Sequence, residues 1–340
     1  MNRFLPDYND PIVSILLLLG IIFIVATLSY AYSIWKQEQK TKELTRFLDK
    51  FDSKECLLDI DNLIFDESMK KPLFLLALAY ERSGEYSKAI NILLFLTKHT
   101  SDESYLKYLA KAYFKAGFLE RSKRIYLQIL SKYPRDIEAL YELELIYEKL
   151  NDFKGAKEVL DVLEELGEDI QKFRLNILIE ESLRTDIHKR FSKLEALLDS
   201  FENKEVIIRE LFKIDSKRAF RYYEDSFFKK LIDILYLLKL EQIDLDIISK
   251  FNNLRQLYYI KGYLDEKIEY KSNFFALDLL SSAKASGFDR ADLNFIYICS
   301  SCKNRYPIYL RRCPACNSLF KINIESLVGE KDEKRGNSLL

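Results

Sequence analysis

Apolar and polar positions follow one another along most of this chain with the spacing of amphipathic helices. Apolar residues recur every three or four positions in stretches such as RFSKLEALLDSF, SFFKKLIDILYLLKL and FFALDLLSSAKASG. Only nine glycines and six prolines interrupt the 340 residues, so the chain lacks the frequent turns of strand-rich folds. The pattern predicts a mainly α protein with short connections between its helices.

Three stretches within residues 70–167 repeat one pattern with a period near 34. The aligned tyrosines, the turn residues and the small residues of the following helix keep steps of 33 and 34 positions: Tyr80, Tyr113 and Tyr147; Gly84, Gly117 and Asn151; Ala89, Ser122 and Ala156. This is the tetratricopeptide pattern, in which each repeat is a hairpin of two helices. We therefore expect three hairpins that stack into an α-solenoid and offer a protein-binding groove.

The small residue on the first helix of each repeat allows its two helices to approach closely. Ala77 and Ala110 take this position in the first two repeats, whereas Glu144 takes it in the third. Stacked first helices line the predicted groove, and they supply six candidate positions for contact with a partner: Phe74, Leu78, Lys107, Lys111, Tyr141 and Leu145.

The clean period is lost over residues 168–290, although helical spacing persists there. We interpret this region as further, degenerate helical repeats, with a separate helical domain as the alternative. Its most apolar run, Leu231–Leu240, includes Asp233 and Lys239 and is too short to cross a bilayer. We therefore expect this run to belong to the core.

Residues 12–35 form an uncharged run of 24 residues, which is long enough to cross a bilayer as one helix. A cleaved signal peptide is the alternative, but the leading residues 1–11 carry one Arg against two Asp, unlike a signal sequence. Lysines and an arginine follow the run in the juxtamembrane lead-in, residues 36–69. Since such residues mark the cytoplasmic side, we expect a single-pass anchor with most of the chain in the cytoplasm.

The cysteines are concentrated near the end of the chain. Cys299 and Cys302 form one C-x-x-C pair, Cys313 and Cys316 form another, and ten residues separate the pairs. Two such pairs on tight turns can supply the four thiolates of a tetrahedral metal site. We predict a small, β-rich, rubredoxin-like zinc ribbon over residues 295–324, with iron as the alternative metal and a redox-active dithiol as a weaker one. A disordered tail is expected from residue 325 to residue 340.

Basic residues surround these cysteines. Lys303, Arg305, Arg311, Arg312 and Lys321 lie in a stretch without acids. Compensation for the negative charge of a four-thiolate metal centre explains them, and docking onto the protein's own helices or onto a partner is a second explanation. Nucleic-acid binding is a third, which the equal numbers of Lys+Arg and Asp+Glu, 53 each, disfavour.

No pattern typical of a catalytic centre occurs. His99 and His188 lie in different helical segments without metal-ligand spacing, and Cys56 has no base near it in the sequence. The acidic pairs Glu164–Glu165 and Glu180–Glu181 diverge on their helices, so we interpret them as solvated faces. The sequence favours a scaffold over an enzyme and implies no cofactor besides the metal.

The order of span, repeats and four-cysteine ribbon resembles the lipopolysaccharide assembly protein B (LapB) family of Gram-negative bacteria. The local likeness lies in Tyr297-Ile-Cys299-Ser-Ser-Cys302, then Tyr309-Leu, then Cys313-Pro-Ala-Cys316. The family's aromatic residue before the second pair is replaced by Arg311 or Arg312.

This resemblance implies an adaptor in the bacterial inner membrane that faces the cytoplasm and regulates lipopolysaccharide synthesis. Family members bring the membrane protease FtsH to the deacetylase LpxC and contact transport machinery. The alternative is a scaffold for another envelope process, such as secretion or division. The sequence leaves the oligomeric state and the docking of the ribbon open.

Overall fold

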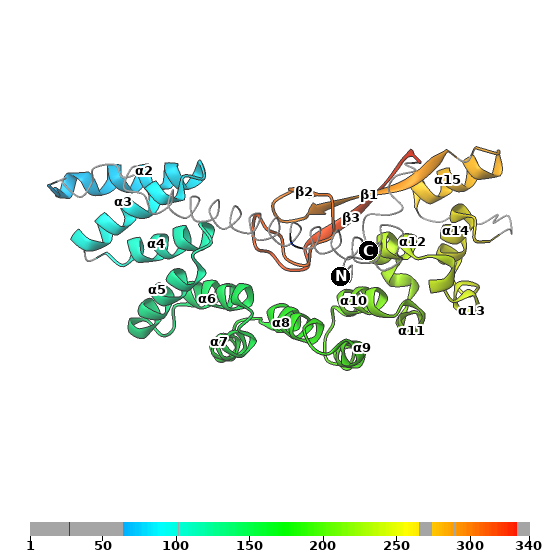
Figure 1. Ribbon diagram of the computed structural model, residues 1–340, viewed down its shortest axis with the longest axis horizontal. Helices are drawn as coiled ribbons and strands as arrows, with labels where there is room; N and C mark the ends of the chain where they lie inside the picture. Colours follow the sequence, from blue (N-terminus) through cyan, green and yellow to red (C-terminus); the bar gives the residue numbers. More distant parts are fainter. Residues whose placement is uncertain (1–26, 28–63, 101, 265–273, 289, 332–340) are drawn as a thin grey trace, which may run out of the picture. The chain divides into compact units, whose positions relative to one another are not determined.

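A computed structural model of the chain describes residue 27 and residues 64–100, 102–264, 274–288 and 290–331 (Figure 1). The predicted tail 1–11, the span 12–35 apart from Thr27, most of the lead-in 36–69 and Cys56 lie outside these residues. Within the described part, no helix combines the length and the apolar character needed to cross a bilayer. The chain divides into two compact units, residues 1–134 and 135–340.

The first unit contains two helical hairpins, preceded by the short 3-10 helix η3 (Glu67–Met69). The hairpins comprise α2 (Lys70–Arg82) with α3 (Tyr86–His99), and α4 (Ser104–Lys115) with α5 (Leu119–Lys132). Gly84 and Gly117 occupy the turns with φ of 82° and 85°, a left-handed backbone that glycine adopts without strain. The glycine turns predicted for the first two repeats are therefore confirmed.

Small residues stand where the helices of this unit come closest. Ala77, Ala89 and Ala110 are almost fully buried, and the buried Ser122 hydroxyl donates a hydrogen bond of 2.8 Å to the carbonyl of Ala110. Aliphatic and aromatic side chains of α3 and α4, among them Leu93 and Leu96, fill the core between the hairpins. The unit is stabilised mainly by this burial, as is usual for short helices.

The second unit opens with the third hairpin, α6 (Ile137–Leu150) and α7 (Phe153–Glu165). Asp136 and Asp152 cap the starts of these helices by accepting hydrogen bonds from the amides of Ala139 and Gly155, at 3.1 and 3.0 Å. Asn151 ends α6 with φ of 60°, in place of the glycine found at the earlier turns. All three predicted repeats are therefore present as helical hairpins.

Helices continue through the region where the sequence period was lost. They are α8 (Gln171–Leu183), α9 (Ile187–Glu195), α10 (Lys204–Ile214), α11 (Ser216–Ala219), α12 (Phe228–Leu237), α13 (Leu245–Ile248), α14 (Asn252–Lys261) and α15 (Phe275–Ala285), with the 3-10 helices η4 (Phe220–Tyr222), η5 (Asp225–Phe227) and η6 (Leu240–Gln242). We call α6, α8, α10 and α12 the first helices of this unit.

The spacing of these first helices explains why the period could not be followed. α8 begins 34 residues after α6, and α10 begins 33 residues after α8, so the repeat continues beyond the third hairpin. α12 then begins only 24 residues after α10, because α11 has shrunk to four residues. The described residues after 168 therefore continue the repeat spacing as far as α10 and are helical up to α15.

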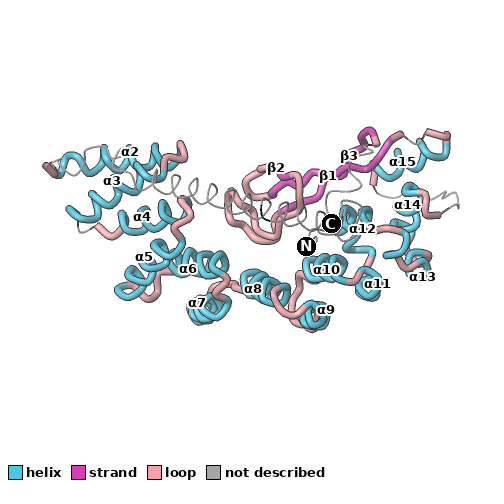
Figure 2. The backbone as a smooth tube through the Cα atoms, viewed as in Figure 1, coloured by secondary structure: helices cyan, strands magenta, loops and turns pink. Residues whose placement is uncertain are grey.

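The chain ends in a three-stranded antiparallel sheet with the order β2-β1-β3, seen in Figure 2. Its strands are β1 (Ala291–Cys299), β2 (Arg305–Tyr306) and β3 (Ile322–Glu330). β1 and β3 pair over their full length, from Ala291 opposite Glu330 to Cys299 opposite Ile322. We call residues 291–330 the ribbon. It is longer than predicted at both ends, and 325–330 continue a strand where we expected the disordered tail to begin.

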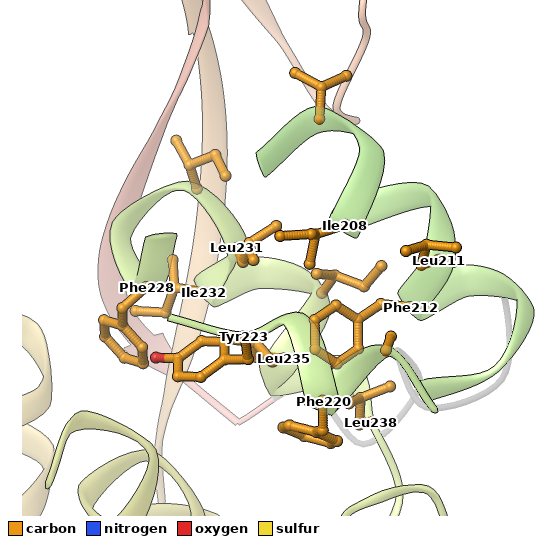
Figure 3. Packing of buried hydrophobic residues seen from close by; sticks show 14 of the residues in the cluster. Ile208, Leu211, Phe212, Phe220, Tyr223, Phe228, Leu231, Ile232, Leu235 and Leu238 are labelled. Atoms are coloured by element: carbon orange, nitrogen blue, oxygen red, sulfur yellow. The ribbon is translucent and has the colours of Figure 1, made fainter. Parts of the chain in front are cut away.

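One hydrophobic core joins the ribbon to the helices of the second unit. Leu293, Tyr297 and Ile324 of the ribbon belong to the same buried cluster as side chains of α8 to α15. Figure 3 shows part of this cluster, in which Ile208, Leu211 and Phe212 of α10 lie among side chains of the following connection, of α12 and of the residue after α12: Phe220, Tyr223, Phe228, Leu231, Ile232, Leu235 and Leu238. The predicted core run Leu231–Leu240 is therefore buried at Leu231–Leu235 and Leu238, whereas Leu237 and Leu240 are exposed.

Candidate metal centre and the ribbon interface

The two C-x-x-C turns have the same backbone conformation. The amide of Lys303 donates to the carbonyl of Cys299 at 2.9 Å, and the amide of Asn317 donates to that of Cys313 at 2.8 Å. Lys303 and Asn317 each lie four residues after the first cysteine of their turn, and both have a left-handed backbone, with φ of 64° and 57°. Two equivalent turns thus present their cysteines toward one point, as the spacing predicts.

The four thiols form a compact cluster. The Sγ atoms of Cys299, Cys302, Cys313 and Cys316 all lie within 4.8 Å of one another. Two of the separations are 3.7 Å, for Cys299 to Cys316, and 3.6 Å, for Cys302 to Cys313. Four sulfurs placed 2.3 Å from a tetrahedral ion are about 3.8 Å apart, whereas a disulfide needs about 2.05 Å. The geometry therefore fits a metal ion such as zinc.

Hydrogen bonds favour thiolate at Cys299 and Cys313, whereas burial and the three neighbouring thiols raise the pKa of Cys302. Burial opposes ionisation of Cys299, but hydrogen bonds from the Ser318 hydroxyl and from the backbone at Cys302 lower the pKa of this thiol to about 6. The Tyr306 hydroxyl lies 3.0 Å from the sulfur of Cys313 and stabilises negative charge there. Metal ligation requires thiolates, and a bound ion would crosslink the two turns and stabilise the ribbon.

Arg312, next to the metal-site cysteine Cys313, lies against α6. Its Nε donates to Glu148 at 3.1 Å, its Nη2 is bonded to the same carboxylate, and Nη2 lies 3.5 Å from both oxygens of Glu144. The side chains of Arg312, Glu144 and Glu148 are 8%, 0% and 9% exposed. Asn176 of α8 donates to Glu148 at 2.9 Å and completes this buried group.

Glu144 therefore has a physical reason to occupy the position that holds alanine in the first two repeats. Burial raises its pKa to about 7, although the neighbouring Arg312 guanidinium acts in the opposite direction. An unpaired carboxylate at a closely packed helix crossing would be strongly destabilising. The departure from the repeat pattern is a docking contact for the ribbon.

Arg311 makes the neighbouring contacts. It is hydrogen-bonded to Glu180 of α8, and its Nη1 lies 4.0 Å from a carboxylate oxygen of Glu210 on α10. The prediction that Glu180 lies on a solvated face is wrong, because Arg311 from the ribbon covers it. Docking onto the protein's own helices accounts for Arg311 and Arg312, while Lys303, Arg305 and Lys321 stay exposed.

A third buried group joins the ribbon to α10 and α12. Arg209 donates to both oxygens of Asp233, at 2.8 and 2.6 Å, and the Tyr297 hydroxyl donates to Asp233 at 2.8 Å. The Arg209 guanidinium lies 3.9 Å from the centre of the Tyr309 ring, in the loop between the cysteine pairs. Arg209 and Asp233 are only 3% and 4% exposed, so the ribbon covers an ion pair that water does not reach.

Sequence reasoning missed these helix residues, although two signals pointed to them. Glu144 broke the small-residue pattern, and Asp233 interrupted an apolar run. Each is a charge at a position that the period assigns to the core, and a buried charge requires a partner. Their partners on the ribbon, Arg312 and Tyr297, lie 168 and 64 residues away, too far for local patterns to identify them.

The six predicted groove positions have different environments. Phe74 contacts Tyr105 and Tyr108 edge to face, and Leu78, Lys107 and Lys111 are half-buried on α2 and α4. In the second unit, Tyr141 donates to Glu168 at 2.9 Å and lies beside Phe173. Leu145 is 4% exposed and so offers no surface to a partner.

No family model matches the chain, and no curated protein matches it. A tetratricopeptide repeat protein from Parabacteroides merdae is 21% identical, covers 72% of this chain and 98% of its own, and has a TM-score of 0.39. The MamA RS-1 ArsTM double mutant is 16% identical, covers 48% and 93%, and has a TM-score of 0.37. Similarities this low do not identify a function. The hairpins, period and turns described above make the chain a tetratricopeptide-like repeat protein with a C-terminal four-cysteine cluster.

Proposed function

We propose that this chain is a membrane-anchored adaptor that faces the cytoplasm and regulates lipopolysaccharide synthesis, by presenting the deacetylase LpxC to the membrane protease FtsH. In this proposed role the chain is not an enzyme. One observation carries it: the four-cysteine ribbon is built into the repeat unit through the buried ion pairs of Arg312 and a shared core. Repeats of this kind are protein-binding scaffolds, and the order of span, repeats and ribbon is that of the LapB family.

The contacts of the ribbon support a structural metal rather than a reactive one. Four thiolates close the coordination shell and leave no open position for a substrate. Residues on both sides of the cysteines, Tyr297, Tyr309, Arg311 and Arg312, are used to hold the helices. We propose zinc as the resident ion. Elemental analysis of the purified chain distinguishes it from iron, which would also give a coloured protein.

The ribbon contacts also weigh against nucleic-acid binding. The guanidinium groups of Arg311 and Arg312 are directed to helix carboxylates, so they do not form part of an exposed basic surface. The span and the basic residues after it support a location in the inner membrane. Anchoring raises the local concentration of partners in the same membrane, which suits an adaptor between a membrane protease and its substrate.

The proposal is tested by crosslinking in cells, followed by affinity purification of the tagged full chain from solubilised membranes. FtsH and LpxC should be recovered, and depletion of the chain should lengthen the half-life of LpxC. A matched strain with Arg305→Ala, an exposed ribbon residue, should behave as wild type. Recovery of secretion or division proteins, together with unchanged LpxC turnover, would instead support the alternative scaffold.

A further inference from the structure

β3 lies at an edge of the ribbon sheet. The strand order β2-β1-β3 gives β3 one neighbour, β1, and among the described residues no backbone hydrogen bond joins β3 to another segment. The opposite edge is protected, because β2 has only two residues and Pro307 follows it. β3 has nine residues and no proline, so its outer side is an open edge.

Hydrogen bonds at the two ends of the β1–β3 ladder show which backbone groups face outward. The amide of Ser300 donates to the carbonyl of Lys321 at 2.7 Å, and the amide of Lys331 donates to that of Arg290 at 2.8 Å. In an antiparallel pair every second residue bonds to the neighbouring strand, so the odd-numbered residues of β3 face β1. The even-numbered residues direct their amides and carbonyls away from β1: Ile322, Ile324, Ser326, Val328 and Glu330.

Side chains along this edge are accessible to another strand. Leu327 and Val328 are 44% and 37% exposed. Ile324 is buried in the shared core and holds the strand against the helices. An exposed edge strand with apolar residues is a template for pairing with a further strand.

The outward backbone groups of β3 match those of a second copy that runs antiparallel. When Leu327 lies opposite Leu327 of the second copy, the outward groups of Ile324 meet those of Glu330. In the same register the outward groups of Ser326 meet those of Val328. Each such pair exchanges two hydrogen bonds, so the two three-stranded sheets become one continuous sheet. A shift by one residue would set outward groups against groups that already bond to β1.

This register also suits the side chains. The two exposed Leu327 side chains lie directly opposite and cover each other. Glu325 lies diagonally across from Lys331 of the second copy, within reach of an ion pair. Both residues are exposed, and neither has an ion-pair partner among the described residues. No two like charges stand directly opposite each other.

We propose that the free edge of β3 binds β3 of a second copy of this chain, antiparallel and centred on Leu327. Complementarity of charge and of apolar side chains selects a second copy over an unrelated strand. A contact between two strands is smaller than the interface of a permanent dimer, so the association is reversible and depends on concentration. This inference concerns assembly and goes beyond the proposed regulatory function.

Sedimentation velocity of the full chain in detergent measures the association. Wild type should change from monomer to dimer between about 1 and 100 µM. Leu327→Lys places two lysines opposite each other and should weaken dimerisation by about tenfold or more. A mixture of Leu327→Lys and Leu327→Glu chains should dimerise again, because residue 327 then faces an opposite charge.

Ser326→Pro tests the backbone contact. It removes an outward amide and leaves the ladder with β1 intact, so it should weaken dimerisation. The matched control Ser326→Ala keeps that amide and should dimerise as wild type does. Metal content and hydrogen-exchange protection of β1 verify that each variant keeps the ribbon folded.

Disulfide crosslinking tests the register, with zinc in excess and in a Cys56→Ser background. Leu327→Cys should give a crosslinked dimer on mild oxidation, because residues in a non-hydrogen-bonded pair have Cα atoms about 4.5 Å apart. In the matched control Asn323→Cys, the two cysteines would lie eight residues apart along the strand, roughly 27 Å, and should not crosslink.

Three results would overturn the inference: a monomer over the whole concentration range, a dimer that Leu327→Lys and Ser326→Pro leave unchanged, or equal crosslinking at positions 327 and 323. A monomeric chain whose Leu327→Cys variant crosslinks to a different protein in cells would show that β3 accepts a partner's strand, and it would also refute the second copy as the occupant. The sedimentation assay contains neither FtsH nor LpxC, so its failure is distinct from failure of the proposed function.

Discussion

Removal of Arg312 should release the ribbon from α6, with a penalty that depends on pH. Arg312→Ala leaves Glu148, 9% exposed, without its guanidinium partner. Loss of one member of a buried ion pair costs about 3–5 kcal/mol, because the remaining charge stays desolvated. This part of the penalty does not depend on Glu144.

Glu144 adds the part that depends on pH. Its pKa is raised from 4.5 to about 7 in the folded chain, mainly by burial. The folded state therefore holds this proton more tightly than the unfolded state, and the stability gained from it is full below 4.5 and lost as pH rises through 7. At pH 8 the raised pKa of Glu144 lowers the free energy of unfolding by about 3 kcal/mol relative to low pH. Arg312 lowers this pKa, so Arg312→Ala should raise it further and make the loss on raising pH larger than in wild type.

Hydrogen exchange followed by mass spectrometry measures the effect locally. The free energy of opening is obtained for amides in residues 306–320 at pH 6 and pH 8, with metal in excess and with correction for intrinsic exchange. Arg312→Ala should lower it at both pH values and by about 1–2 kcal/mol more at pH 8. Arg305→Ala, exposed on β2 of the same ribbon, should have little effect.

Two results would refute this reasoning. The first is a penalty for Arg312→Ala that is equal at pH 6 and pH 8, which would mean that Glu144 does not titrate in this range. The second is a penalty no larger than that of Arg305→Ala, which would mean that the buried contact does not hold the ribbon. Addition of Glu144→Gln to Arg312→Ala should remove the pH-dependent part alone.

Two further predictions concern the ribbon. Cys302→Ser/Cys316→Ser should release the metal, measured by elemental analysis, and reduce the hydrogen-exchange protection of β1 and β3, while membrane fractionation stays unchanged. A metal content equal to that of wild type would contradict the assignment of the site. Tyr297→Phe removes the hydroxyl that donates to the buried Asp233, so it should destabilise the ribbon by about 1–3 kcal/mol in the same exchange assay. The control Tyr133→Phe changes a residue that is 52% exposed and should be neutral. Equal protection in these two variants would count against the Asp233 contact.

The sequence predicted the features that depend on neighbouring residues. Helix periodicity, the turns at Gly84, Gly117 and Asn151, and the paired cysteine turns are each specified within a few positions, so they could be recognised without a structure. The same holds for the four clustered cysteines, because two short spacings define them. The helices after residue 168 were predicted only in kind, since α11 and α13 are too short to leave a periodic signal.

The docking of the ribbon could not be predicted, because it depends on charges far apart in the chain. Glu180 looks like any other acid on a helix surface, and only the position of Arg311, 131 residues later, shows its role. Glu144 and Asp233 were visible as exceptions to the pattern, but an exception does not name its partner. Buried charges at core positions of a repeat are therefore useful signs of a docked segment.

The long separation of these partners affects the order in which the second unit is completed during synthesis. Glu148 leaves the ribosome 164 residues before Arg312, which corresponds to about 10–30 s of translation. Throughout that interval Glu144 and Glu148 of α6 and Glu180 of α8 lack the guanidinium groups of Arg311 and Arg312. A chain that stops before the ribbon would keep these charges and the apolar surface beside them uncovered. The ribosome therefore has to reach the C-terminal residues before the second unit can finish folding, and premature termination should yield a chain that proteases remove.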